Sequence, residues 1–140
     1  MTSAMPYAFP LITLALFLAL LLRRFKGRRK KLSPKEFEFL VAEALRRAGY
    51  REVRVVGRPR DRGIDITCKD EKGDKVIVQC KSLCKRKIGS PEVRSLIGSM
   101  VLEGAKKALI VSTSSFSEPA KELAKRYNVE VKEVAMKLVH

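Results

Sequence analysis

The sequence predicts a three-layer α/β domain with a mixed sheet, preceded by one N-terminal transmembrane helix. Three observations favour this organisation. Residues 1–22 carry no charged side chain. From residue 32 onward, segments with helical periodicity alternate with segments typical of strands. The segment Ala108 to Thr113 opens with a continuous apolar run, which is typical of a central strand buried on both faces. We therefore expect a membrane anchor with a basic juxtamembrane segment over 1–31 and a folded domain over 32–140.

The predicted anchor is the uncharged stretch from Ala4 to Leu22. Its nineteen residues are close to the roughly twenty that a helix needs to cross a bilayer. A secretory signal would carry its basic residues before the apolar run. A buried core helix would need a polar stripe or a larger domain to cover it. Seven Lys and Arg residues between Arg23 and Lys31 predict a cytoplasmic C-terminal domain by the positive-inside rule.

Charge and cysteine content limit the classes of function. The net charge is +15, and the part from residue 32 onward holds 23 of the 30 basic residues and all 15 acidic ones. A basic domain favours a polyanion such as nucleic acid, and the alternative is a heat-adapted surface. The cysteines Cys68, Cys80 and Cys84 have no CxxC spacing, and the one histidine is His140. This excludes a disulfide framework and a Cys/His metal cluster, so any metal must be held by oxygen ligands.

The folded domain begins with a helix. Ser33 is a plausible N-cap, Pro34 suits the first helical position, and Glu36 completes a capping box. The helix is expected to end near residue 48, because Gly49 follows it. Further strands are predicted at 53–56, 64–69, 75–82, 108–113 and 129–134, and further helices at 91–104, capped by Ser90, and from Ser117 to about Asn128. Basic loops are expected at 57–63 and 83–90, and a turn at 70–74.

The second and third strands should form a hairpin with polar side chains at its open end. If the turn centres on Lys72, Asp65 lies opposite Gln79, and Lys81 lies one pleat further along. This spacing, D-x13-Q-x-K, would bring a carboxylate, an amide oxygen and an ammonium group together. The alternative is an ion pair with only a structural role.

Such a group of side chains suits phosphodiester hydrolysis. Asp65, the side-chain oxygen of Gln79 and the carbonyl of Cys80 are candidate ligands for Mg²⁺, which prefers oxygen. Glu38, on the first helix beside its apolar stripe, could reach the same metal. Lys81 would orient or deprotonate the attacking water, or neutralise charge on the phosphate. Two other acids of this helix have plainer explanations, since Glu36 is a capping residue and Glu43 lies on a solvated face.

The wider pattern resembles a known family. The ordered segments are Phe37-Glu38, Asp61-Arg62-Gly63-Ile64-Asp65 and Val78-Gln79-Cys80-Lys81. Together they resemble the Mrr family of restriction endonucleases, in the PD-(D/E)xK nuclease superfamily, over about 32–134. The resemblance implies a three-layer α/β/α restriction-endonuclease-like core, a requirement for Mg²⁺ (or Mn²⁺), and cleavage of duplex DNA, in some members only modified DNA.

The same resemblance assigns roles to the candidate residues. Glu38 is the helix acid, Asp65 the metal-binding aspartate and Lys81 the catalytic lysine. Gln79 stands where most of the superfamily has an acid, although glutamine is common in the Mrr branch. It removes one negative charge, which should weaken metal affinity. Gly63 is expected in a tight turn or a close approach of the backbone to DNA.

Partners follow from the same argument. Phosphate contacts are expected from the two basic loops, through Arg58, Arg60, Arg62, Lys85, Arg86 and Lys87, although such charges are often only solvated. Cleavage of both strands favours a homodimer. The expected function is a membrane-tethered endonuclease of the restriction or defence type. The alternatives are a catalytically silent DNA-binding module and a junction-cleaving resolvase of the same superfamily.

Overall fold

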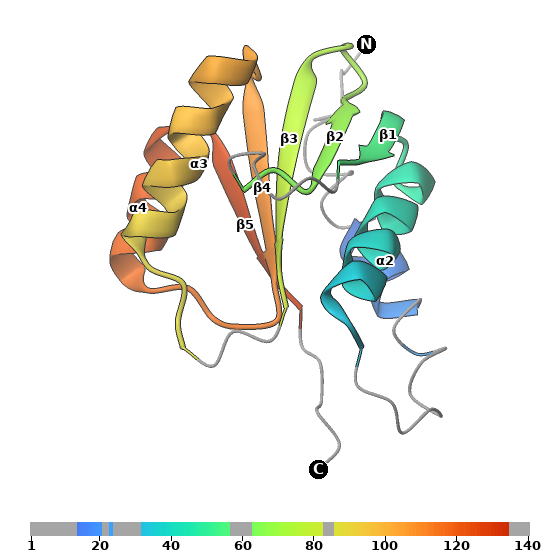
Figure 1. The fold of residues 1–140 in the computed structure, drawn as a ribbon, viewed down its shortest axis with the longest axis horizontal. Helices are drawn as coiled ribbons and strands as arrows, with labels where there is room; N and C mark the ends of the chain where they lie inside the picture. The colour runs from blue at the N-terminus through green and yellow to red at the C-terminus, as the bar shows by residue number, and fades with distance from the viewer. Residues whose placement is uncertain (1–13, 21–22, 24–31, 57–62, 83–85, 135–140) are drawn as a thin grey trace, which may run out of the picture.

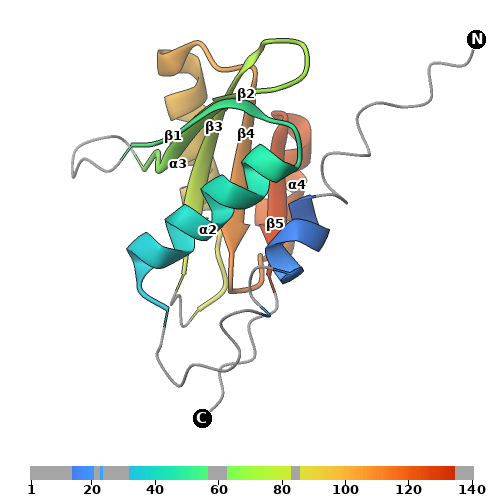
Figure 2. The same ribbon diagram turned by 90° about the vertical axis from the view of Figure 1, so that its right-hand side faces the viewer.

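The domain has three layers around one mixed sheet. The computed structural model describes residues 14–20, 23, 32–56, 63–82 and 86–134. Helix α2 (Pro34–Arg47) covers one face of the sheet, and α3 (Ser90–Glu103) and α4 (Glu118–Arg126) cover the other (Figures 1 and 2). The strands are β1 (Arg51–Val55), β2 (Ile66–Lys69), β3 (Lys75–Lys81), β4 (Lys107–Ser112) and β5 (Val129–Glu133). The predicted three-layer α/β architecture is confirmed.

The five strands lie in sequence order across the sheet. The first three are antiparallel, and β3, β4 and β5 are parallel. In the β2–β3 hairpin Ile66 pairs with Val78 and Lys69 with Lys75, so the hairpin is centred on Lys72. The carboxylate of Asp70 stabilises the turn by accepting hydrogen bonds from the backbone N–H groups of residues 72 and 74. The predicted turn centre is therefore confirmed, and with it the predicted register over Ile66–Lys69 and Lys75–Val78.

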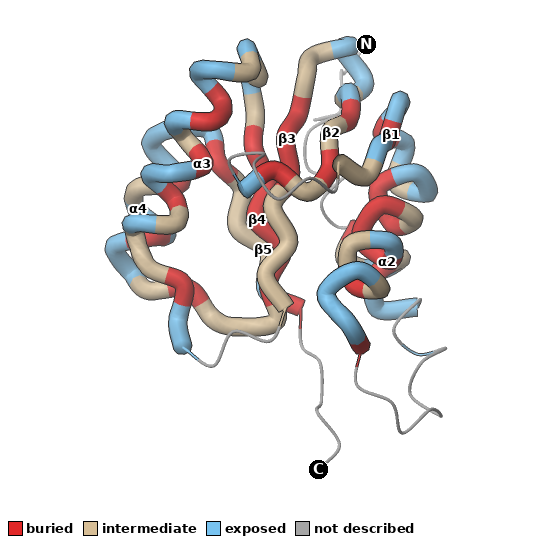
Figure 3. The backbone as a smooth tube through the Cα atoms, viewed as in Figure 1, coloured by how far each residue is buried: buried red, intermediate tan, exposed pale blue. Residues whose placement is uncertain are grey.

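Two apolar cores lie on opposite faces of the sheet. On β3, Val76 and Val78 point into the core under α2, and Ile77 points into the core under α3 and α4. All residues of β4 from Ala108 to Ser112 are buried (Figure 3). This strand is the central, doubly covered strand that its apolar run predicts.

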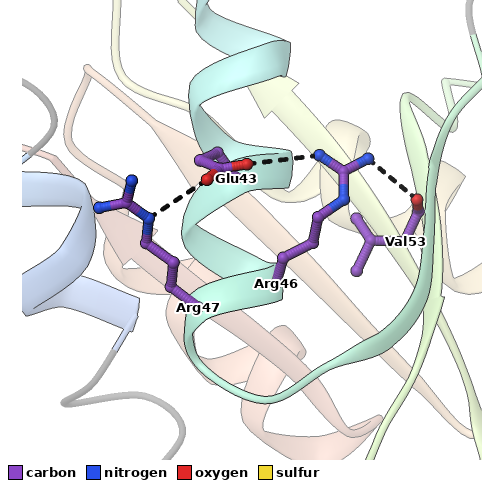
Figure 4. A network of polar contacts seen from close by, with 4 residues as sticks. All are labelled: Glu43, Arg46, Arg47 and Val53. Carbon is purple, nitrogen blue, oxygen red and sulfur yellow. Dashed lines mark hydrogen bonds and ion pairs between the residues drawn. The ribbon is translucent and has the colours of Figure 1, made fainter.

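Helix α2 is anchored at both ends. The Ser33 side chain accepts a hydrogen bond from the N–H of Glu36, and the Glu36 carboxylate accepts one from the N–H of Ser33, so the predicted capping box is present. Near the other end, Arg46 donates a 3.1 Å hydrogen bond to the carbonyl of Val53 in β1. Glu43 pairs with Arg46 and with the neighbouring Arg47 (Figure 4). The C-terminal end of the helix is thus bonded to β1, the edge strand of the sheet.

Several element boundaries differ from the sequence prediction. Strand β1 begins at Arg51 rather than at residue 53, and α4 ends at Arg126 rather than near Asn128. Strand β2 begins at Ile66 rather than at Ile64, because Ile64 is buried in the α3-side core whereas Ile66 is buried in the α2-side core. A regular strand would put both side chains on one face. Helix α3 begins one residue early, with Gly89 as its N-cap in place of Ser90. The Glu92 carboxylate accepts a 3.2 Å hydrogen bond from the N–H of Gly89.

The N-terminal apolar segment is described only in part. Residues 14–20 are helical, and Leu14 and Leu18 are buried in the α2-side core. Among the described residues, no helix has both the length and the apolar character needed to cross a bilayer. The remainder of the expected anchor, and its basic cluster apart from Arg23, lies outside the described residues.

Candidate active site

Asp65 lies just before β2, at the open end of the hairpin. Its backbone is held on both sides, because its N–H donates to the carbonyl of Val78 and its carbonyl accepts from the N–H of Val56, at 2.9 and 2.7 Å. Its side chain is held as well, since Oδ2 accepts a 2.7 Å hydrogen bond from the backbone N–H of Cys80. In a regular hairpin the N–H of Cys80 would bind a backbone carbonyl of the neighbouring strand. Here it binds the Asp65 carboxylate instead.

Glu38 reaches this carboxylate from α2. Burial raises the pKa of Glu38, the charge of Asp65 and a side-chain hydrogen bond with Asp65 add to this, and the same hydrogen bond lowers the pKa of Asp65. Burial is the largest cause that raises the pKa of both carboxyl groups. For Asp65 it outweighs the opposing effects of the Cys80 N–H and the Lys81 charge.

The other two acids of α2 have partners elsewhere. Glu36 is occupied in the capping box, and Glu43 pairs with two arginines at the far end of the helix. Glu38 is therefore the acid of α2 that interacts with Asp65.

Gln79 follows the buried part of β3. The strand pairing ends at Ile66–Val78, and the N–H of Asp65 donates to the carbonyl of Val78, so Gln79 directly follows the β3 residue that binds the Asp65 backbone. Its side-chain oxygen Oε1 is buried and has no hydrogen-bond partner. A buried amide oxygen without a donor is costly, and a bound cation would satisfy it. Its amide nitrogen lies so close to the backbone of Gly63 that a methyl group added there would come within 2.6 Å of it.

Cys80 contributes its backbone to the site. The N–H and C=O of one strand residue point to the same edge, and its N–H points to Asp65, so its carbonyl faces the same side. Burial raises the pKa of the Cys80 thiol well above its ordinary value, and the charges of Asp65 and Glu38 add to this. The thiol therefore stays protonated at neutral pH. Only the carbonyl of Cys80 fits the metal-ligand role that the sequence suggests.

Lys81 ends β3, and its charge lowers the pKa of Asp65, so the ammonium group acts on the carboxylate. Its carbonyl accepts a 3.0 Å hydrogen bond from the N–H of Thr113, which ties this end of β3 to the residue after β4. The structure therefore brings the charged groups of Glu38, Asp65 and Lys81 together, and the Gln79 amide lies against Gly63, two residues before Asp65.

The predicted DNA-contacting residues are covered only in part. Arg58, Arg60, Arg62 and Lys85 lie outside the described residues. Arg86 and Lys87 are exposed, and Arg86 is 4.0 Å from the carboxylate of Glu92. They directly precede Ile88, which is buried and bridges to Phe116.

The donor set of the site fits a hard divalent cation. It comprises two carboxyl groups, an orphaned amide oxygen and a backbone carbonyl, all oxygen donors. Within the described ranges, no group of three or more His, Cys, Asp or Glu side chains could hold a metal. A cation here would therefore depend on Gln79, the carbonyl of Cys80 and non-protein oxygens to complete its shell.

Comparison with known proteins identifies the domain. The family model Mrr_cat, described as restriction endonuclease, matches residues 29–137. The chain belongs to this family. The methyl-directed type IV restriction enzyme EcoKMrr of Escherichia coli K12 is 32% identical over 116 residues, covering 79% of this chain and 38% of that enzyme. The chain thus spans well under half of its curated relative.

Solved structures support the same fold. A repair endonuclease from Pyrococcus abyssi has a TM-score of 0.57 at 22% identity, covering 75% of this chain and 48% of that one. The DNA modification-dependent restriction endonuclease AspBHI has a TM-score of 0.58 at 16% identity, covering 87% and 33%. The restriction-endonuclease-like fold that the motifs imply is therefore confirmed for this Mrr-family domain.

Two contacts of the site were not predicted. The sequence suggests the Cys80 carbonyl as a ligand, but not that the Cys80 N–H binds Asp65. It also suggests that Gly63 sits in a tight turn or near DNA, and the structure places it against Gln79 with a φ of +75°. The glycine next to the motif was the one signal in the sequence, but its partner follows only from the three-dimensional packing.

Proposed function

We propose that this Mrr-family domain is a Mg²⁺-dependent endonuclease that hydrolyses phosphodiester bonds of double-stranded DNA, of the restriction or defence type. The observation that carries the proposal is the interaction of Asp65 with Glu38 and Lys81 at the open end of one hairpin, where the buried Oε1 of Gln79 has no partner. These residue types offer oxygen donors beside a fixed positive charge. Family membership supports the same reaction class.

Each residue would have a distinct role. Asp65 and the Oε1 atom of Gln79 would hold the cation, with the carbonyl of Cys80 and the Glu38 carboxylate beside them. A bound Mg²⁺ or Mn²⁺ supplies polarisation of the scissile phosphate and a lower pKa for a bound water. Lys81 would orient the attacking water and offset the negative charge that develops on the phosphate oxygens. Because the pKa of Glu38 is raised, a proton would compete with the cation for this carboxylate.

The direct test is cleavage of plasmid by the purified chain. Wild type, Asp65→Ala and Lys81→Ala should be incubated with Mg²⁺ and with Mn²⁺, on methylated and unmethylated plasmid, since the relative EcoKMrr is methyl-directed. We expect cleavage by wild type alone. Failure of wild type on every substrate would contradict the proposal. Binding without cleavage would instead indicate a silent DNA-binding module, and a preference for four-way junctions would indicate a resolvase.

We propose that two copies act together on DNA, because one active site cuts one strand at a time and a duplex has two strands. The exposed pair Arg86 and Lys87, with the basic residues of the loops, would contact phosphates in each copy. Light scattering of the purified chain with and without a duplex tests the stoichiometry. Plasmid that is only nicked by a monomer would contradict this part of the proposal.

We also propose, from the sequence, that residues 4–22 attach the chain to a membrane as a single pass, with the domain in the cytoplasm. The uncharged run and the basic residues after it support this. The burial of Leu14 and Leu18 against the domain favours the competing arrangement, in which the segment packs on the protein. Carbonate-washed membranes should retain the chain. Recovery of the full chain in the soluble fraction would contradict attachment.

A further inference from the structure

We propose that Gly63 is a positioning residue for the metal site: the absence of a side chain at this position lets the Gln79 amide lie where its oxygen faces the cation. The inference rests on the proposed function. It concerns a residue that lies on a different segment from Gln79 and is sixteen positions away in the sequence. Gly63 would touch neither substrate nor cation, and would act only through Gln79.

The contact between these residues leaves no room for a methyl group. A Cβ atom on Gly63 would lie 2.6 Å from Nε2 of Gln79 and 3.6 Å from its Cδ, and the shorter distance is far inside van der Waals contact. The amide group that would be displaced is the one whose Oε1 is buried without a partner. A small shift of the amide would therefore move the candidate ligand atom itself.

The backbone cannot relieve this clash easily. Two residues after Gly63, Asp65 is hydrogen-bonded through its N–H, its carbonyl and its side chain. Between them, Ile64 is buried in the α3-side core. Since the backbone beside Gly63 is held in this way, the flexible Gln79 side chain should give way instead. The expected defect is thus local to the amide.

The chain contains a matched control for this substitution. Gly73, in the β2–β3 turn, has a φ of +83°, close to the +75° of Gly63, but a Cβ atom there would meet nothing within 4 Å. Alanine is strained by the left-handed backbone at both positions. Only Gly63→Ala adds a clash with Gln79. The difference between the two variants therefore isolates the effect on the amide.

The first measurement is the affinity of the full chain for Mn²⁺ alone, by calorimetry or electron paramagnetic resonance. Gly63→Ala should weaken binding by about ten-fold or more, the size of effect that outer-shell residues have on metal sites, and Gly73→Ala should not. Gln79→Ala should weaken binding too, and adding Gly63→Ala to it should cost little more, because both changes remove the same ligand. Equal affinity in Gly63→Ala and Gly73→Ala, or fully additive losses, would overturn the proposal.

The second measurement does not need the metal. The side-chain amide resonance of Gln79, assigned through Gln79→Ala, should shift in Gly63→Ala and stay in place in Gly73→Ala. An unmoved resonance overturns the positioning role and leaves the proposed nuclease function intact. Wild type that binds no Mn²⁺ overturns both. If Gly63→Ala melts too low for spectroscopy, the double variant with Gln79→Ala should melt higher than Gly63→Ala, and failure to do so overturns the contact.

Discussion

The backbone N–H of Cys80 donates a 2.7 Å hydrogen bond to Oδ2 of Asp65, in place of a ladder bond between β3 and β2. This bond fixes one oxygen of the carboxylate on the protein. Because the bond runs through the backbone, it does not depend on the side chain at position 80, and the site is built from the geometry of the hairpin.

Asp65→Asn should reduce cleavage but raise the stability of the metal-free protein. The pKa of Asp65 is raised by burial, so its negative charge at neutral pH costs folding free energy when no cation is bound. Asparagine keeps the shape and an oxygen for the Cys80 N–H without the charge. Cleavage should fall by at least about 100-fold. Melting in chelator at neutral pH should rise, and Asp74→Asn, which changes an acid paired with Lys106, should show neither effect.

A melting temperature of Asp65→Asn in chelator below that of wild type would contradict this prediction. It would mean that the Asp65 charge is stabilised by its surroundings rather than penalised by burial.

The metal-free protein should lose stability as pH rises through the pKa values of Glu38 and Asp65. Both are raised from ordinary values of 4.5 and 3.8, so above those values the folded chain holds protons that the unfolded chain has released. The stabilising contribution is complete below the ordinary values and is lost as pH passes the raised ones. Melting curves in chelator should show the trend, and added Mn²⁺ should reverse it at neutral pH.

The double variant Glu38→Gln with Asp65→Asn isolates this effect from the other ionisable groups. Its stability, relative to wild type, should grow as pH rises. Glu43→Gln is the matched control, because Glu43 lies on the same helix but pairs with Arg46 and Arg47. If the melting temperatures of wild type and the double variant change in parallel with pH, the burial of Glu38 and Asp65 does not penalise their charged forms.

Lys81→Met should reduce cleavage by about 10²–10³-fold, the typical effect of removing one group that stabilises transition-state charge. The loss should fall on kcat, with Mn²⁺ affinity retained, because Lys81 is not a ligand. Lys75→Met is the control on the same strand. It removes an ion pair with Glu103, worth at most about 1 kcal/mol, at the other end of β3. If Lys81→Met and Lys75→Met cleave DNA equally well, Lys81 takes no part in the reaction.

Much of the site could be predicted because strands have a period of two and the turn has recognisable residues. Asp70 and Gly73 mark the turn, and once its centre is known the register pairs Ile66 with Val78, which brings Asp65 and Gln79 to the same end of the hairpin. Glu38 could be selected among the acids of α2 because it adjoins the apolar stripe. These inferences need only local periodicity and one turn.

The rest of the site could not be predicted, because it depends on which of the two apolar cores each side chain enters. Ile64 and Ile66 have the spacing of one strand face, so the sequence predicts a strand from residue 64. In the structure they are buried on opposite faces of the sheet, and the chain between them turns enough to free the Asp65 carboxylate. The contact of Gly63 with Gln79 has the same origin. Neither follows from spacing, because both result from packing between segments distant in the sequence.

Gln79→Glu should strengthen metal binding and weaken the metal-free fold. The substitution adds a negative charge next to Val78, whose carbonyl binds the Asp65 N–H, at a position where the amide oxygen of Gln79 is already buried without a partner. With a cation bound, the new charge should raise Mn²⁺ affinity by about ten-fold, equivalent to roughly 1.4 kcal/mol. Without a cation, the carboxylate should repel Asp65 and lower the melting temperature in chelator by several degrees.

Calorimetric titration and melting with and without Mn²⁺ measure both effects of Gln79→Glu. Glu130→Gln, which changes an acid of β5 paired with Lys107, serves as a control for charge changes elsewhere in the sheet. Unchanged Mn²⁺ affinity in Gln79→Glu would show that residue 79 does not face the cation, because a carboxylate in the ligand shell must respond to the charge it binds.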